Sequence, residues 1–147
     1  MTAVAALSVL LTGLLAGGEL LVRWGVAPAL SRLPDHAHLL ARQSLVRRLR
    51  VLVPAVMGPA AALTVVALVL APVPLRWVGT TALAVFVLVS VLGTVPINIR
   101  VDAWDTAAPP AGWRTLVRRW ERIDVVRSTA ATVAFGCLLA ASVWPGV

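Results

Sequence analysis

Two ionisable residues three positions apart, Asp124 and Arg127, are the first candidates for chemistry in this chain. With 100° per residue over positions 113–127, both fall on the same helix face as Trp120, whereas Arg118 falls on the opposite face. An ionisable pair on an apolar, inward face is costly unless it is paired or handles protons or ligands. The pair is therefore a candidate site. The alternative, equally consistent with the residues, is an i, i+3 salt bridge that only holds the helix end.

A second polar cluster begins at Pro96, at the end of another apolar run. Asn98 and Asp102 lie four residues apart and share a helical face, as do Arg100 and Trp104. Because Pro96 removes one backbone hydrogen bond, we expect the helix to bend there. The cluster adds hydrogen-bonding groups to the candidate site.

The elements that must position these residues are long apolar runs. The chain is 60% hydrophobic and 13% charged, with a mean hydropathy of +0.93, whereas a soluble domain is about half apolar and roughly a quarter charged. Because lipid cannot hydrogen-bond a bare backbone, runs of this length are expected to be membrane-spanning helices. The sequence predicts an all-α, integral membrane four-helix bundle forming one domain, residues 1–147. Its spans cover about residues 2–22, 51–71, 77–99 and 127–145.

The positions of the arginines predict the orientation. All thirteen basic residues are arginine: six lie in residues 23–50, six in residues 100–127, and only Arg76 lies between the second and third spans. Excess positive charge is retained on the cytoplasmic side during insertion. We therefore expect a multi-pass protein of the inner (cytoplasmic) membrane, with connections 23–50 and 100–126 in the cytoplasm and both termini outside. This distribution favours membrane topology over nucleic-acid binding.

The two long connections are expected to contain amphipathic helical extensions that run into the second and fourth spans. In the first, residues 35–50 place Leu39 and Val46 towards one side, which predicts a helix that lies along the membrane surface before turning in. His36 and His38 lie two apart, a spacing that points them in different directions on a helix, so no metal site is expected there.

Small residues at four-residue spacing suggest where helices pack closely, because they let backbones approach. Such spacings arise easily in an alanine-rich chain. The pairs are Gly13 with Gly17, Gly58 with Ala62, and Gly136 with Ala140.

Given the predicted orientation, the polar candidates converge on the cytoplasmic end of the bundle. A polar pocket under an apolar funnel suits an aromatic ligand that partitions into lipid. Glu19 also lies four residues before Arg23, so the simpler interpretation of Glu19 is that it forms an ion pair with Arg23 at the membrane interface. The converging residues are Glu19, Asn98, Arg100, Asp102, Asp124 and Arg127.

At these residues the chain resembles the small four-helix membrane family that includes the anthrone oxygenases of aromatic polyketide pathways, and the resemblance runs nearly end to end. Its N-terminal part is a glycine-bearing first helix followed by a Val-x-Pro-like turn. Its stronger part lies around the third and fourth spans. The residues that carry it are Gly13, Gly17, Val26 to Leu30, Leu33 and Pro34, then Pro96, Ile97, Asn98, Trp104, Trp113, Trp120 and Arg127.

The resemblance implies oxygenation of an anthrone to an anthraquinone by O₂ without metal or flavin. The central CH₂ of an anthrone is acidic because its carbanion is a phenolate-like anion, and that anion can pass an electron to O₂. Such an enzyme needs a general base and donors at the developing oxyanion. Our hypothesis on this basis takes Asp124 as the base, Arg127 and Asn98 as donors to the enolate oxygen, and Trp104 and Trp120 as aromatic walls.

The remaining substrate-binding candidates are Arg100, Glu19 and Asp102. In the family a histidine commonly stands three residues before the final arginine, and here that position is Asp124. This chain would thus use a carboxylate where relatives use an imidazole. The expected partners are the lipid bilayer, an apolar aromatic substrate and O₂, and a homo-oligomer stays open.

Three other functions remain open from the sequence. The polar cluster could staple helices in a non-catalytic membrane scaffold. Another tailoring reaction, such as cyclisation, would suit the same pocket. Small-molecule export with Glu19 as a proton carrier is less favoured, since a carrier glutamate is expected nearer the middle of the membrane.

Overall fold

The computed structural model describes residues 2–144, and every regular element in this range is helical. In chain order the elements are α1 (Ala3–Leu21), the π-helical turn η1 (Val22–Val26), α2 (Ala27–Ser31), α3 (Asp35–Leu70), α4 (Pro74–Val89), the π-helical turn η2 (Ser90–Thr94), α5 (Val95–Asp102) and α6 (Trp113–Val143). They join into four units, each long and apolar enough to cross a membrane. Over the described residues the all-α four-helix prediction is confirmed, and the four apolar helices indicate a multi-pass membrane protein.

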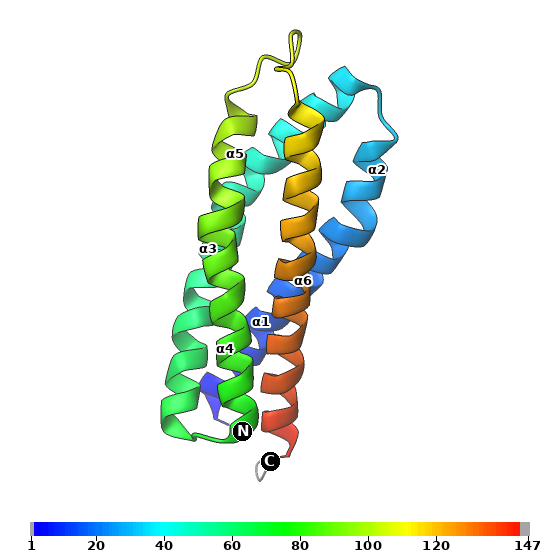
Figure 1. The fold of residues 1–147 in the computed structure, drawn as a ribbon. Coiled ribbons are helices and arrows are strands. Elements are labelled where there is room, and N and C mark those ends of the chain that lie inside the picture. Colours follow the sequence, from blue (N-terminus) through cyan, green and yellow to red (C-terminus); the bar gives the residue numbers. More distant parts are fainter. Residues whose placement is uncertain (1, 145–147) are drawn as a thin grey trace.

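The four units form an elongated bundle with both chain ends at one end (Figure 1). A short turn at residues 71–73 joins α3 to α4 at that same end, as the prolines there predict. The opposite end contains the α2–α3 and α5–α6 connections; because residues 23–50 and 100–127 build it, we call it the arginine-rich end. The predicted end of the fourth span, at residue 145, lies outside the described residues.

The predicted helical extensions exist, but the first does not lie flat on a membrane surface. Helix α3 runs without interruption from Asp35 to Leu70, and its Leu39 and Val46 are fully or almost fully buried. Val46 packs with Ile97 and Val101 of α5 and Trp120 of α6. The surface-lying prediction is therefore wrong, because the apolar side of this extension is covered by neighbouring helices.

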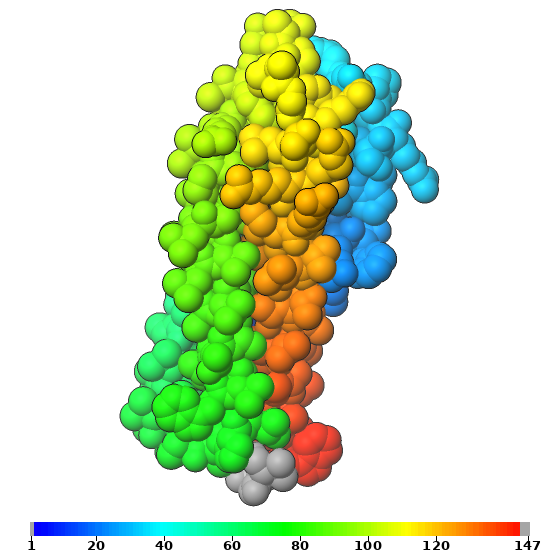
Figure 2. Space-filling model, in the orientation of Figure 1, coloured from blue at the N-terminus to red at the C-terminus, as the bar shows by residue number. Residues whose placement is uncertain are grey.

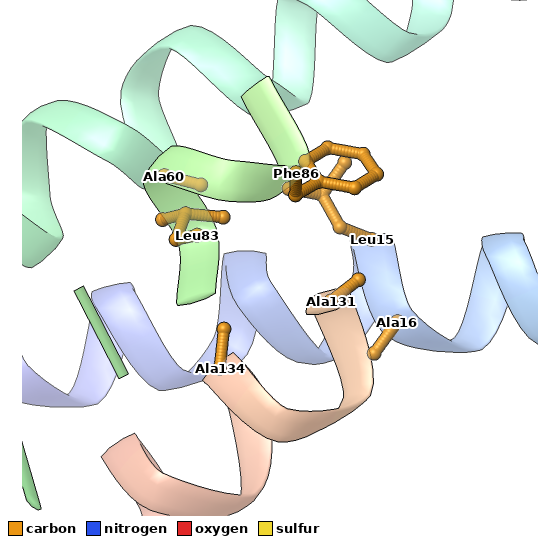
Figure 3. Close-up of a cluster of buried hydrophobic side chains, with 7 residues drawn as sticks. All are labelled: Leu15, Ala16, Ala60, Leu83, Phe86, Ala131 and Ala134. Carbon is orange, nitrogen blue, oxygen red and sulfur yellow. The ribbon is translucent and has the colours of Figure 1, made fainter. Parts of the chain in front are cut away.

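The main apolar core is rich in alanine and takes residues from all four helical units (Figure 3). Its residues lie in the half of each unit nearer the chain ends. Small side chains bring the helices close together, and three larger ones, Leu15, Leu83 and Phe86, fill the space between them. We call this cluster the alanine-rich core. It comprises Leu15, Ala16, Ala60, Leu83, Phe86, Ala131 and Ala134.

Glycines permit the closest helix contacts, but mostly not the glycines that the spacing indicated. A Cβ at Gly79 would lie 3.0 Å from Leu138 Cγ, and one at Gly13 would lie 2.9 Å from Phe135 Cε2. At Gly17, Gly58 and Gly136 a Cβ would meet no atom within 4 Å. The expectation of close packing thus holds at Gly13 and is wrong at the other three.

Each π-helical turn precedes a proline by two residues. Pro28 follows η1 and Pro96 follows η2. Proline lacks an N–H and its ring clashes with the preceding turn, and a wider turn accommodates the disruption. The distortion expected at Pro96 takes this form. The turn η1 begins three residues after Glu19, and η2 begins at Ser90. Arg127 binds both Glu19 and Ser90, so the two π turns lie near the same level of the bundle.

The outer surface of the bundle carries many large apolar side chains. Val69 and Leu92 are more than 70% exposed, and the tryptophans Trp24 in η1, Trp77 near the start of α4 and Trp144 at the end of α6 are exposed as well. Figure 2 shows α4 and α6 packed against each other along one such face. So much exposed apolar surface suits lipid rather than water.

Candidate functional site

A cavity of about 300 Å³ lies between α1, α3 and α6. Leucine and valine side chains from α1, η1 and α3 form most of its wall. Four other side chains interrupt this apolar wall and come from both ends of the sequence: Glu19, Trp120, Asp124 and Arg127. The cavity is therefore the place where the sequence candidates meet.

Arg127 connects the polar residues of three helical units. Its Nη2 donates to Glu19 Oε1 at 2.7 Å, and its Nε donates to Ser90 Oγ at 2.9 Å. Its guanidinium carbon lies 5.2 Å from the centre of the Phe86 ring, so the alanine-rich core forms the floor of the site. The third nitrogen, Nη1, is 3.6 Å from Asp124 Oδ1, longer than a hydrogen bond.

Asp124 is the least satisfied member of the group. Its side chain is 3% exposed, and its Oδ1 has no hydrogen-bond partner. Leaving a buried polar atom unpaired costs about 1–3 kcal/mol. Two carboxylates, Glu19 and Asp124, also share the guanidinium of Arg127, which hydrogen-bonds Glu19 but not Asp124. Asp124 is thus placed to accept a proton or a donor from a ligand.

The ion pair between Glu19 and Arg23 that the four-residue spacing predicts is absent from the structure. Glu19 is buried against Arg127, whereas Arg23 Nη1 donates to Ser128 Oγ at 3.1 Å and to Thr129 Oγ1 at 3.4 Å. The π-helical turn that starts at Val22 explains the difference, because it holds more residues per turn than an α-helix and so moves Arg23 out of α-helical register with Glu19.

Trp120 is held in the cavity wall from two sides. Its Nε1 donates to Asn98 Oδ1 at 3.2 Å, and the guanidinium carbon of buried Arg42 lies 4.9 Å from the ring centre. Asn98 itself is not among the lining residues. The structure therefore places Asn98 behind the aromatic wall, supporting Trp120, and not beside Arg127.

The other three candidates lie away from the cavity at the arginine-rich end. Asp102 binds Arg47 Nε at 2.5 Å and Arg50 Nη1 at 3.3 Å. Arg100 and Trp104 border a separate hollow near the α5–α6 connection. The expected convergence on one pocket thus holds for Glu19, Trp120, Asp124 and Arg127 but not for these residues or Asn98.

The two histidines point to different partners. His36 Nδ1 lies 2.9 Å from the carbonyl oxygen of Thr106, and His38 Nε2 accepts from Arg42 Nε at 3.2 Å. The His36 contact fastens α3 to the α5–α6 connection, whereas the His38–Arg42 hydrogen bond lies within α3.

Sequence reasoning missed two residues that matter to the site. Ser90 lies in a long apolar run, and nothing in its spacing indicates that it accepts from Arg127. The sequence places Arg42 among the arginines of the first connection, yet its side chain is 2% exposed. Its position four residues before Val46, on the same face as Leu39, was the available signal.

A family model described as anthrone oxygenase matches residues 47–137, which is more than half of the chain. The match includes Trp120, Asp124 and Arg127 and excludes Glu19. No curated protein and no solved structure matches the chain.

Proposed function

This chain belongs to the anthrone oxygenase family, and from that premise we propose that it is a membrane oxygenase that converts an anthrone-like aromatic compound to the corresponding quinone with O₂. The observation that carries the proposal is Asp124, a buried carboxylate with a free oxygen that borders an apolar cavity beside Arg127. Family membership supports oxygenase-type activity, and the cavity supports the class of substrate.

The substrate reaches the cavity from the lipid. Two lining residues, Leu14 of α1 and Leu52 of α3, are 57% and 61% exposed on the outer surface, so the cavity opens sideways between these helices. Ligand pockets begin at about 300 Å³, which suits a small fused aromatic system. An apolar substrate dissolved in the bilayer needs no path through water.

The reaction begins with proton abstraction. A C–H bond of the central methylene breaks, the proton moves to the Asp124 carboxylate, and the electron pair delocalises onto the substrate oxygen. The carbanion gives one electron to O₂, and the carbon radical left behind combines with the resulting superoxide, which forms the C–O bond of a peroxide anion. The peroxide takes up the proton. Loss of the second methylene hydrogen as a proton, with cleavage of the O–O bond, yields the quinone carbonyl and water.

Arg127 stabilises the enolate oxygen. Two of its nitrogens are already bound to Glu19 and Ser90, which fixes the guanidinium before the substrate arrives, and Nη1 remains for the developing charge. The Trp120 ring packs on the aromatic substrate. Because the carbanion itself reduces O₂, we propose that neither a metal nor a flavin is required.

The arginine distribution supports the predicted orientation, with the arginine-rich end in the cytoplasm and both termini outside. In that orientation the site lies on the cytoplasmic side of the inner membrane.

A non-catalytic scaffold is the second candidate, and the Arg127 network favours it. That network joins α1, η2 and α6, as a purely structural staple would.

The test measures O₂ uptake and quinone formation by purified protein in lipid vesicles supplied with anthrone. An oxygenase consumes one O₂ per quinone, faster than protein-free vesicles do, and anthrone raises its unfolding temperature. A scaffold changes neither quantity, and that result would exclude the proposed activity.

A further inference from the structure

Asp124 borders two hollows. The first is the apolar cavity between α1, α3 and α6. The second, of about 360 Å³, lies between α6 and the η1–α2 segment. Its lining includes Arg23, Ser31 and Glu121, so we call it the polar hollow. A residue that is 3% exposed thus forms part of the wall of both spaces.

The two hollows differ in what borders their mouths. Exposed leucines border the cavity, whereas exposed Pro28 and Ser31 and the half-exposed carboxylate of Glu121 border the polar hollow. Glu121 Oε1 lies 3.6 Å from Arg42 Nη2, a buried nitrogen without a hydrogen-bond partner. Water can therefore be hydrogen-bonded from the mouth of the polar hollow inward, whereas the mouth of the cavity is apolar.

Charged groups surround Asp124 from every neighbouring element. Glu19 comes from α1, Arg23 from η1, Arg42 from α3, and Glu121 and Arg127 from α6. Glu19 is closed off because it is bound to Arg127 and lines the apolar cavity. Of the two carboxylates near Asp124, Glu19 and Glu121, it is Glu121 that borders the polar hollow, and its side chain is 39% exposed.

Resting on the proposed function, we propose that the polar hollow connects Asp124 to water, with Glu121 as the proton relay, while the substrate occupies the lipid-facing cavity on the other side of the same carboxylate. The proton taken from the methylene moves from Asp124 through water to Glu121 and then to the solvent, and a solvent proton returns by the same path. The water formed by O–O cleavage leaves through this hollow.

Proton exchange between the substrate and the solvent can be measured without oxygen, and this tests the proton route separately from turnover. In anaerobic vesicles in D₂O, a carbanion that forms and reprotonates replaces methylene hydrogen with deuterium, and only a base that exchanges its proton with solvent can do so. The overall oxidation of anthrone to the quinone releases no net proton. The rate of turnover should therefore depend less on the proton route through the polar hollow than the rate of deuterium exchange does.

The experiment compares the wild type, Glu121→Gln, Glu121→Asp and Ala27→Phe, using anthrone as the probe. Ala27→Phe fills the polar hollow, which Ala27 lines, from the α2 side. Asp105→Asn is the control, since Asp105 is an exposed acid that lines neither hollow. Deuterium incorporation is followed by mass spectrometry against protein-free vesicles, and aerobic quinone formation is measured in parallel.

We expect Glu121→Gln and Ala27→Phe to slow enzyme-dependent exchange by about tenfold or more and to slow aerobic turnover by a smaller factor. Glu121→Asp should restore most of the exchange. Unchanged exchange in both blocking variants, or equal losses of exchange and turnover, would overturn the proposed route while leaving the oxygenase intact. A wild type that catalyses neither process contradicts the proposed function itself.

Discussion

The two halves of the bundle are held together in different ways. Around the alanine-rich core the helices pack through small side chains and two close glycines, Gly13 and Gly79. At the arginine-rich end they are joined by specific polar contacts, such as those of Arg127, Gln43 and Asp35. Because lipid is as apolar as leucine, close packing of small side chains is what holds the helices together around the alanine-rich core. Buried charges at the arginine-rich end are costly, so we expect them to have a function that packing cannot supply.

The largest effect should come from breaking the polar network at Arg127. Arg127→Met leaves Glu19 and Asp124 buried without their cation, so the free energy of unfolding should fall by about 3–5 kcal/mol and turnover should be lost. Thermal unfolding in detergent measures the first quantity. Arg122→Met, on the exposed side of α6, is the matched control. If both variants unfold at the wild-type temperature, the network is not a stabilising feature.

The packed half can be broken at Gly79. Valine there must displace Leu138 or the Ala134 carbonyl oxygen of α6, which lies 3.3 Å from the added Cβ. Overpacking costs about 1–3 kcal/mol. Gly136→Val is the control because its Cβ meets open space. The unfolding temperatures of the two variants should differ clearly, and similar values would show that α4 and α6 can separate freely.

A smaller effect should follow from removing the hydrogen bond between Asn98 and Trp120, which supports the aromatic wall of the cavity. Asn98→Leu removes the acceptor of the Trp120 N–H, which lowers the free energy of unfolding by about 1 kcal/mol and raises KM for anthrone by about fivefold, with little change in kcat. In a Trp120→Phe background, which lacks that N–H, the same Asn98 substitution should raise KM no further. An additive rise in KM would mean that Asn98 acts on the substrate by another contact.

The smallest effect should come from an exposed ion pair at the arginine-rich end. Asp35 Oδ1 lies 2.6 Å from Arg114 Nη2, but both side chains are more than half exposed. Asp35→Asn should therefore change the free energy of unfolding by less than about 1 kcal/mol. A large drop in unfolding temperature would show that the surface of this end, and not its interior, holds it together.

The same difference explains what the sequence could predict. Long uncharged runs define the four helical units, because lipid permits few other structures, and the 100° periodicity places Asp124 and Arg127 inward. The partners across the bundle were not predictable. Ser90 reaches Arg127 from the π turn before Pro96, and Asn98 reaches Trp120 from α5, in each case across to a different helical unit. Spacing within one helix carries no information on such contacts.

Predictions from small residues failed for a related reason. Gly17, Gly58 and Gly136 have the spacing of packing motifs, yet each faces open space, whereas Gly79 packs closely without a four-residue partner glycine. The spacing describes one helix surface and says nothing of which surface meets a neighbour.

The central claim is that Asp124 removes the substrate proton. The most direct measurement is the initial rate of anthrone oxidation by Asp124→Asn in vesicles, compared with wild type at equal folded protein. The asparagine fills the same space but cannot accept the proton, so the rate should fall by about 100-fold or more towards that of protein-free vesicles, with the unfolding temperature kept near that of wild type. A variant that stays folded and oxidises anthrone at the wild-type rate would contradict the claim.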